Sequence, residues 1–185
     1  PEVVNEIVEY GGTINLKDNV TNLADLPEGT EVYDTTQTPI DTTSSGQHPA
    51  QITVVYPDGS KDVININVTV KPQPLNQIYD PVVSEEIVEY GAASYDLTDN
   101  VINKSTFPQN GYTITEVTFE YNPQGIDTSV SGTQEGWIRV TYTGDDTYDD
   151  VKVNVIVKPQ PLNQQYTPEV VNEIVEYGGT LNLKD

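Results

Sequence analysis

Apolar and polar residues alternate with a period of two over several stretches of the chain. In Ile64–Val70, isoleucine or valine occupies every second position, with asparagine or threonine between them. This period is that of a β-strand with one buried and one solvated face. The apolar run Ile52–Tyr56 comes before it, and Pro57–Ser60 separates the two with residues typical of a tight turn. The pattern therefore predicts a β-hairpin over residues 52–70.

The same pattern returns later in the chain. Ile138–Tyr142 and Val151–Val157 predict two strands, joined by the polar turn Gly144–Thr147. Thr113–Tyr121 predicts a further strand, with Val117, Phe119 and Tyr121 on one face. β-branched residues, proline and glycine break every candidate helix, so we expect at most one short helical turn, within residues 18–25.

Repetition organises the chain. Residues 1–18 return as residues 168–185 with one difference, Ile14 becoming Leu181, and a weaker copy starts at Pro81. The string KPQPLNQ occurs at 71–77 and again at 158–164. These repeats predict module A over residues 1–79, a longer module B over 80–166, and the start of another copy of A over 167–185.

The last segment has two interpretations. Residues 167–185 are either a free start of the next module, or residues 170–177 form a strand that pairs along module B. Each module of about 80 residues, with several short strands and turns between them, predicts a small antiparallel β-sandwich. The fold class is therefore all-β, with small modules arranged head to tail. The proline-rich KPQPLNQ joints are expected to be semi-extended.

Composition and charge exclude several classes of protein. The chain has 29 acidic and 8 basic residues, a formal net charge of -21, and no cysteine. Nucleic-acid binding needs a basic surface, and a disulfide or thiolate site needs cysteine. Since no apolar run approaches the length of a membrane span, we expect no membrane insertion. The chain begins with Pro1 and has no leader sequence, so we expect targeting signals to lie elsewhere.

Module A contains the motifs LPEGT at Leu26–Thr30 and YPDGSKD at Tyr56–Asp62. With these motifs it resembles the Rib/alpha-like repeat of Gram-positive surface proteins. Module B departs from both, with FPQNG at Phe107–Gly111 and YTGD at Tyr142–Asp145, and so resembles a long or atypical variant. The resemblance implies immunoglobulin-like β modules in a protein anchored to the cell wall, projecting a distal region away from the bacterium.

His48 is the only histidine and follows Ser44 and Ser45. A serine hydrolase would need this base held against the nucleophile and oriented by a carboxylate. The matching stretch of module B, Ser131–Glu135, contains no histidine. We therefore interpret His48 as a loop residue and expect no catalytic residues and no enzyme activity.

Acidic residues cluster in the second predicted hairpin. Asp145, Asp146, Asp149 and Asp150 supply oxygen atoms of the kind that Ca²⁺ prefers, but their spacing is not that of an EF-hand loop. A solvated acidic hairpin is the favoured interpretation, and a weak Ca²⁺ site is the alternative. No other cofactor is expected.

Trp137, the only tryptophan, stands two residues before Arg139. If Ile138, Val140 and Tyr142 face the core, Trp137 and Arg139 lie on the outward face, where they form a candidate surface for a sugar or a protein partner. The favoured interpretation is that Trp137 packs under a neighbouring loop or the joint between the modules.

The leading hypothesis is a non-enzymatic, elongated stalk on the surface of a Gram-positive bacterium. Its partners are the neighbouring repeats of the same chain, and we expect a monomer because like-charged modules repel one another. The second hypothesis is an adhesin whose repeats bind host mucin, a glycan or a surface protein.

Overall fold

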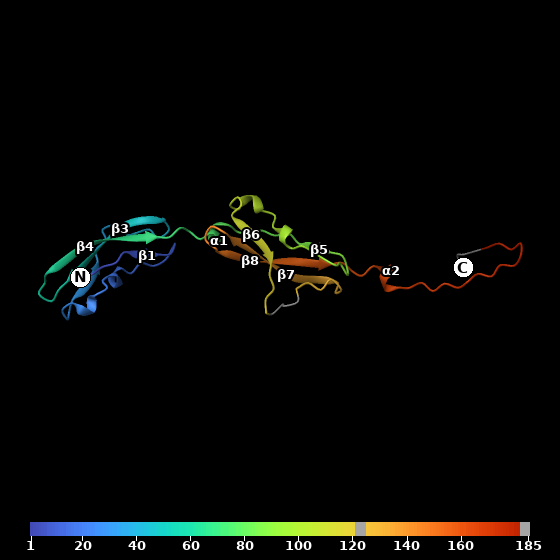
Figure 1. The fold of residues 1–185 in the computed structure, drawn as a ribbon, viewed down its shortest axis with the longest axis horizontal. Helices are drawn as coiled ribbons and strands as arrows, with labels where there is room; N and C mark the ends of the chain where they lie inside the picture. The colour runs from blue at the N-terminus through green and yellow to red at the C-terminus, as the bar shows by residue number, and fades with distance from the viewer. Residues whose placement is uncertain (121–124, 182–185) are drawn as a thin grey trace. The chain divides into compact units, whose positions relative to one another are not determined.

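The structure, a computed structural model, describes residues 1–120 and 125–181 and contains two compact units (Figure 1). The first unit consists of Pro1–Asp80, Ser105–Thr113 and Thr141–Asp149, and the second consists of the remaining residues. Each repeat contributes one four-stranded sheet. The predicted all-β class, with tandem modules, is confirmed.

The sheet of the first repeat has the strand order β1-β4-β3-β2. Its strands are β1 (Glu6–Val8), β2 (Glu31–Asp34), β3 (Gly46–Val55) and β4 (Lys61–Val70). The predicted hairpin is confirmed and longer than expected, because β3 and β4 pair antiparallel from Gly46 opposite Val70 to Val55 opposite Lys61. β2 pairs antiparallel with β3 on the far side of the hairpin.

One pairing was not predicted. β1 runs parallel to β4, with Glu6 opposite Val68 and Val8 opposite Val70. The same occurs in the second repeat, where β5 (Glu86–Val88) runs parallel to β8 (Tyr148–Val157), with Val88 opposite Val157. Parallel neighbours need a long connection between them, and here it is most of the module. The first and last strands of each repeat are thus side by side, which closes the module.

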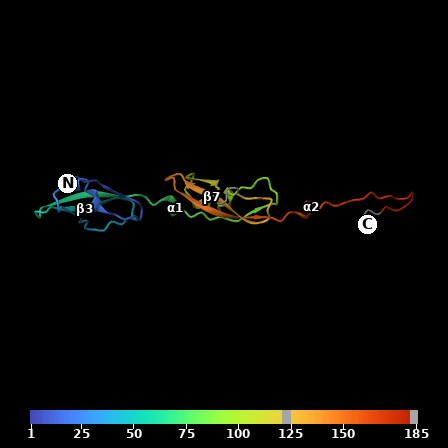
Figure 2. The same cartoon turned by 90° about the horizontal axis from the view of Figure 1, so that it is seen from below.

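The second repeat has the corresponding order β5-β8-β7-β6. Its remaining strands are β6 (Tyr112–Glu116), β7 (Gly132–Tyr142) and β8 (Tyr148–Val157). β6 ends at Glu116, five residues before the predicted end of that strand, and Tyr121 lies outside the described residues. Figure 2 shows the β7 hairpin from a second side.

Both cores are built from the buried side of the central hairpin. Ile52, Val54 and Val68 are completely buried in the first repeat, as are Ile138, Val140, Tyr142, Val153 and Val155 in the second. Side chains that alternate along paired strands stack on one face, so each strand contributes every second residue to the core. The alternation read from the sequence therefore identifies the buried face in both repeats.

Short helical turns fill the connections. They are the 3₁₀ turns η1 (Leu16–Asn19), η2 (Leu23–Asp25), η3 (Thr98–Asn100) and η4 (Lys104–Thr106), and the single α-turns α1 (Leu75–Ile78) and α2 (Leu162–Gln165). The region of residues 18–25, expected to contain one short turn, contains parts of two. α1 and α2 begin in the two copies of the joint and end one residue after them. They were not predicted, since proline marks the joint as extended.

A buried asparagine fixes the entry of each module. Asn19 Nδ2 donates to the backbone oxygen of Val4 and to Glu6 Oε2, at 3.1 Å in both cases. In the second repeat Asn100 Nδ2 donates to Glu86 Oε2 at 3.1 Å. Because a buried amide without partners is costly, these bonds hold the chain before β1 or β5 against the 3₁₀ turn.

The segment after α2 forms no strand within residues 167–181. Its apolar side chains are exposed, and Val171 and Ile174 retain 93% and 89% of their accessible surface. Residues 170–177 thus do not pair with a strand of module B, and the start of another module A at residue 167 stays a prediction. In the described parts of the chain we find no helix with the length and apolar character needed to cross a membrane.

The core assignment is testable in the second repeat, where Trp137 provides a fluorescence signal. Ile138→Ala should lower the free energy of unfolding of that repeat by about 2 to 5 kcal/mol, because it leaves a cavity under a fully buried side chain. Ile87→Ala is the matched control, since Ile87 is 60% exposed. Denaturant titrations followed by fluorescence measure both, and equal losses in the two variants would contradict the assignment.

Candidate functional site

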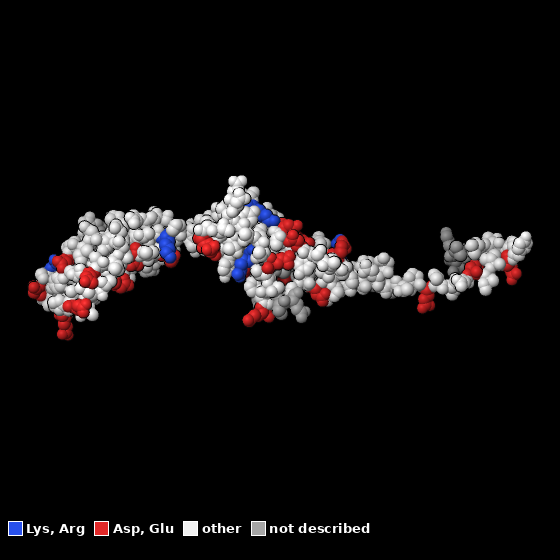
Figure 3. Space-filling view, viewed as in Figure 1, with Lys and Arg blue, Asp and Glu red and all other residues white. Residues whose placement is uncertain are grey.

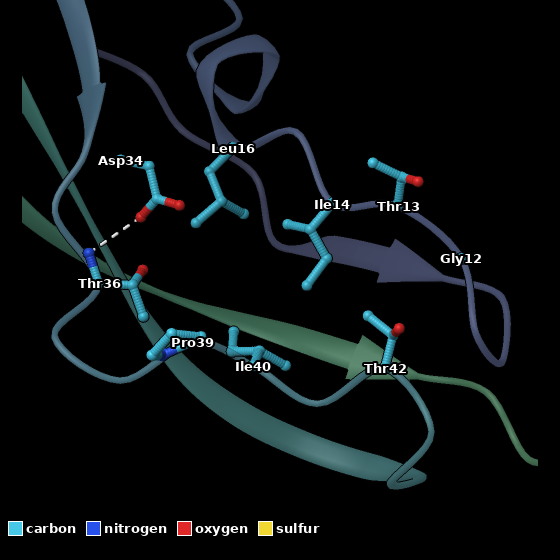
Figure 4. Close-up of a pocket in the computed structure, with 9 residues that line it drawn as sticks. All are labelled: Gly12, Thr13, Ile14, Leu16, Asp34, Thr36, Pro39, Ile40 and Thr42. Carbon is cyan, nitrogen blue, oxygen red and sulfur yellow. Dashed lines mark hydrogen bonds between the residues drawn. The ribbon is translucent and has the colours of Figure 1, made fainter.

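A hollow with a volume of about 440 Å³ lies in the first repeat (Figure 4). Ile14 and Leu16 point into it from one side, and Pro39 and Ile40 from the other. The charged side chain in its lining is Asp34, whose Oδ1 accepts a hydrogen bond of 2.9 Å from the backbone N–H of Thr36. The hollow therefore combines apolar walls with a carboxylate and threonine hydroxyls.

The second repeat fills the corresponding position. When Leu16 is aligned with Leu97, Tyr95 stands in the place of Ile14. The Tyr95 hydroxyl accepts a hydrogen bond of 3.4 Å from the backbone N–H of Ile126. The hollow lined by Tyr95 and Leu97 has only about 110 Å³. Of these two hollows in the described residues, the one in module A is therefore the larger.

His48 contacts the backbone. Its Nε2 lies 2.7 Å from the backbone oxygen of Ser44, so the ring binds a carbonyl group and not a serine hydroxyl. Gln134, the aligned residue of the second repeat, donates from Nε2 to the backbone oxygen of Val130 at 2.8 Å. Both side chains thus brace the turn four residues before them. His48 lies in β3, opposite Val68 of β4, so the prediction of a loop residue is wrong: the antiparallel pairing extends further than the alternation in the sequence indicated.

Trp137 and Arg139 lie on one face of β7, while Ile138 and Val140 are fully buried on the other. Both outward side chains are half-buried. Trp137 packs edge-on against Phe119, with ring centroids 5.3 Å apart. Arg139 forms a two-pronged ion pair with Asp150, with Nε–Oδ1 and Nη2–Oδ2 distances of 2.7 and 2.8 Å. Both side chains are held in place, and binding of a partner there stays a prediction.

The four aspartates of the second hairpin do not share one centre. Asp145 Oδ1 accepts from the backbone N–H and hydroxyl of Thr147, Asp149 accepts from the Tyr142 hydroxyl at 2.9 Å, and Asp150 binds Arg139. Asp146 occupies the turn with a positive φ of 59°. Within residues 1–120 and 125–181 there is no group of three or more acidic, histidine or cysteine side chains arranged to hold a metal ion. Calcium binding at this hairpin stays a prediction.

The tips of the two hairpins share a tyrosine–aspartate pair. The Tyr56 hydroxyl donates to Asp62 at 2.8 Å, as Tyr142 does to Asp149. Burial of Tyr142, and then its bond to the Asp149 carboxylate, raises the pKa of Tyr142 far above its ordinary value. The hydrogen bond to Asp62 raises the pKa of Tyr56 as well. Both tyrosines therefore stay protonated donors that tie the hairpin ends together.

The joint between the repeats contacts the second hairpin, which sequence reasoning missed. The Leu75 N–H donates to Asp145 Oδ2 at 2.7 Å, and the Asn76 N–H donates to Thr147 Oγ1 at 3.2 Å. Asn76 Nδ2 also donates to the backbone oxygen of Tyr148. The ring of Tyr79 lies against Tyr142, with centroids 5.6 Å apart, and against Phe107 at 6.0 Å. α1 is therefore docked on the hairpin tip, and Asp145 serves as its acceptor.

Among the charged side chains, acidic ones are in large excess. On the face seen in Figure 3, red carboxylates are scattered among a few isolated basic side chains. Their numbers follow the sequence, with 11 acidic residues in module A, 14 in module B and 4 in the last segment. This distribution gives each repeat the same sign of charge and provides no basic region for an anionic partner.

Taken together, the sheets and sites define an all-β tandem repeat. Comparison with known proteins identifies it. The model of the Rib domain family matches residues 1–72 and 76–159, so the chain belongs to the Rib domain family and contains two such domains. The second match begins inside α1 and thus includes the docked Asn76 and Tyr79.

A streptococcal relative agrees with this assignment. The C protein alpha-antigen of Streptococcus agalactiae serotype Ia is 32% identical over 174 residues, covering 90% of this chain and 16% of that protein. The chain thus spans about a sixth of the length of this relative. A solved Rib structure from Streptococcus pyogenes is 32% identical and aligns with a TM-score of 0.35, covering 38% of this chain and 90% of that one. The crystal structure of human mucin-like protocadherin EC1-2 aligns over 85% of this chain, and 98% of its own, with 16% identity and a TM-score of 0.26.

The aspartate turns give a pH-dependent prediction. Hydroxyl donors, followed by backbone N–H donors, hold the pKa of four carboxyl groups below the ordinary value of 3.8; these are Asp41, Asp58, Asp96 and Asp127. A depressed pKa contributes stability above the unfolded value, and this contribution is lost as the pH falls through the folded value. NMR titration of the carboxyl carbons should place all four pKa values below 3.8.

The matching stability measurement uses a variant that cannot titrate. Asp127→Asn keeps an oxygen for the Ser129 N–H and hydroxyl, which Asp127 now binds at 2.9 and 2.6 Å. Between about pH 5 and pH 2 the second repeat of this variant should lose less stability than that of the parent protein. Equal losses would mean that the turn does not favour the ionised carboxyl group.

Proposed function

We propose that the chain is a spacer in the repeat region of a bacterial surface protein, where it carries a distal region away from the cell wall. The observation that carries the proposal is the docked joint. Leu75 and Asn76 give three hydrogen bonds to the tip of the second hairpin, and Tyr79 adds ring contacts. A spacer needs joints that resist bending, and such contacts restrict a segment that would otherwise move freely.

The family supports a location on the surface of a Gram-positive bacterium. Two Rib domains stand in tandem, and a matching relative is a streptococcal protein whose name describes it as an antigen. Attachment to the cell wall belongs to the same proposal. It concerns the whole protein, of which this chain resembles a part.

The net negative charge supports a spacer that stays monomeric. Each repeat carries an excess of acidic residues within the overall charge of -21. Like-charged modules repel one another when they approach side by side, so lateral association between chains is disfavoured. The partners in this proposal are the neighbouring repeats, and the protein works as a monomer.

The side chains that resemble catalytic or metal-binding groups have structural partners. His48 braces the Ser44 turn, Asp149 binds Tyr142, and Asp150 binds Arg139. These contacts support a protein without enzymatic activity and without a required cofactor. The acidic hairpin is then best understood as a solvated surface that also receives the joint.

An adhesin is the second candidate, and the shared face of Trp137 and Arg139 favours it. Tryptophan and arginine are enriched among the residues that dominate protein interfaces. Both are partly accessible on β7. In this alternative the repeats themselves bind a host mucin, glycan or protein through that face.

The rigidity of the joint is testable because the chain has no cysteine. Ser45→Cys and Ser131→Cys place spin labels at exposed, equivalent positions of the two repeats. The distance distribution between the labels should be narrow. Asp145→Ala, which removes the acceptor of the Leu75 N–H, should broaden it. Asp58→Ala removes the corresponding aspartate of module A and should leave it unchanged, and a broad distribution in the parent would overturn the proposal.

A binding measurement separates the two candidates. The spacer proposal expects no signal from the chain on immobilised mucin or a glycan array. An adhesin would give a signal that Trp137→Ala or Arg139→Ala abolishes and that Ile87→Ala, on an exposed position of β5, preserves. Thermal unfolding of each variant checks that a lost signal does not reflect a lost fold.

A further inference from the structure

The two copies of the joint adopt the same local structure. α1 and α2 each follow a proline, Pro74 or Pro161, with ψ of 143° and 142°. In each, a glutamine side chain closes the turn, since Gln73 donates to the Gln77 oxygen and Gln160 to the Gln164 oxygen, both at 3.3 Å. The sequence of the joint thus determines a preformed turn that does not depend on what lies next to it.

The environments of the two copies differ. Leu75 and Tyr79 are half-buried on the second hairpin, whereas Leu162 and Tyr166 are 69% and 68% exposed. Leu75 approaches the hairpin so closely that a Cβ on Gly144 would lie 2.9 Å from its Cδ1. One copy of the joint is therefore docked, and the other presents the same side chains to solvent.

Module A carries a counterpart of the module B surface on which α1 is docked. Asp58 Oδ1 accepts from the Ser60 N–H and hydroxyl at 2.9 and 2.6 Å, as Asp145 Oδ1 does from Thr147. Asp58 Oδ2 is therefore the counterpart of Asp145 Oδ2, which accepts the hydrogen bond from the Leu75 N–H. Tyr56 stands where Tyr142 contacts Tyr79, because both donate to an aspartate on the following strand.

A hollow marks this surface. Its volume is about 420 Å³, and it is lined by Pro27, Tyr56, Pro57, Asp58 and Ser60. Pro27 aligns with Pro108, next to the Phe107 that Tyr79 contacts in the second repeat. The hollow thus has apolar walls beside the Asp58 carboxylate and the Ser60 hydroxyl. Apolar walls suit the leucine side chain of the joint, and the two polar groups supply acceptors for its backbone N–H groups.

The sequence identifies the occupant. Residues 158–167 lead directly into residues 168–185, which repeat residues 1–18 with one difference. Residues 71–80 lead into module B in the same way. In both joints the tyrosine comes four residues after the leucine and two before the proline that opens the next copy. A segment with the sequence of residues 158–167 therefore has the correct length to stand before a module A.

We propose that the hollow at Asp58 is the docking site for a copy of the joint with the sequence of residues 158–167, placed directly before module A. The leucine N–H of that copy donates to Asp58 Oδ2, the following N–H donates to Ser60 Oγ, and the tyrosine ring packs against Tyr56. The inference deepens the spacer proposal and rests on it. It makes the joint a single adaptor that fits both kinds of module, so that repeats can be added without redesigning the contact.

The test uses the full chain extended by a second copy of residues 158–167 in front of Pro1. Hydrogen exchange by NMR should show slow exchange at the leucine amide of the added copy. Asp58→Asn should speed that exchange by about tenfold, because the turn keeps an acceptor for Ser60 while the carboxylate that receives the joint is lost. Asp41→Asn is the matched control, since Asp41 makes the same kind of turn with Thr43 and lies outside the proposed site.

The docked joint provides an internal reference. Asp145→Asn should expose the Leu75 amide and leave the added joint protected. If the added leucine exchanges as fast as Leu162 while Leu75 stays protected, the proposal is wrong. Protection that depends on protein concentration would also overturn it, since the joint would then dock on another molecule. Neither result changes the outcome of the mucin or glycan measurement, so the two proposals fail separately.

Discussion

The pairing of two ten-residue strands into one long hairpin is the constraint on which each repeat depends. β3 and β4 pair over their whole length, and their inward side chains form most of the core of module A. A module of this size buries only a small hydrophobic core on one face of its sheet. Its remaining parts are arranged to complete that core. β1, the 3₁₀ turns and β2 each cover an edge or an end of the hairpin.

The hairpin also fixes the chemistry at its tip. A tyrosine at the end of one strand and an aspartate near the start of the next are brought together in both repeats. An aspartate turn between them presents one carboxylate oxygen to its own backbone, and in the second repeat the other oxygen receives the joint. The acidic residues of these tips therefore have structural roles. Each of Asp145, Asp149 and Asp150 binds a different partner in the fold.

In the spacer proposal, function depends on contacts along the chain and not on a pocket. The joint contributes backbone N–H groups, which need acceptors, and the hairpin tip supplies them from side chains. The joint and the hairpin tips both recur, and our proposals use one set of contacts wherever two modules meet in sequence. In those proposals the repeat region gains length by duplication, and acidic surfaces keep such chains apart.

Local patterns along the chain were enough to predict the repeats, the all-β class and the central hairpins, because alternation, turn residues and duplication can be read in one dimension. The parallel pairing of β1 with β4 could not be predicted in this way, since three residues of strand carry no mark of a partner 62 positions away. The donor that each aspartate binds, and the docking of the proline-rich joint through Leu75 and Tyr79, likewise became visible only in the folded chain. Those joint contacts connect residues about seventy positions apart, and no periodicity records them.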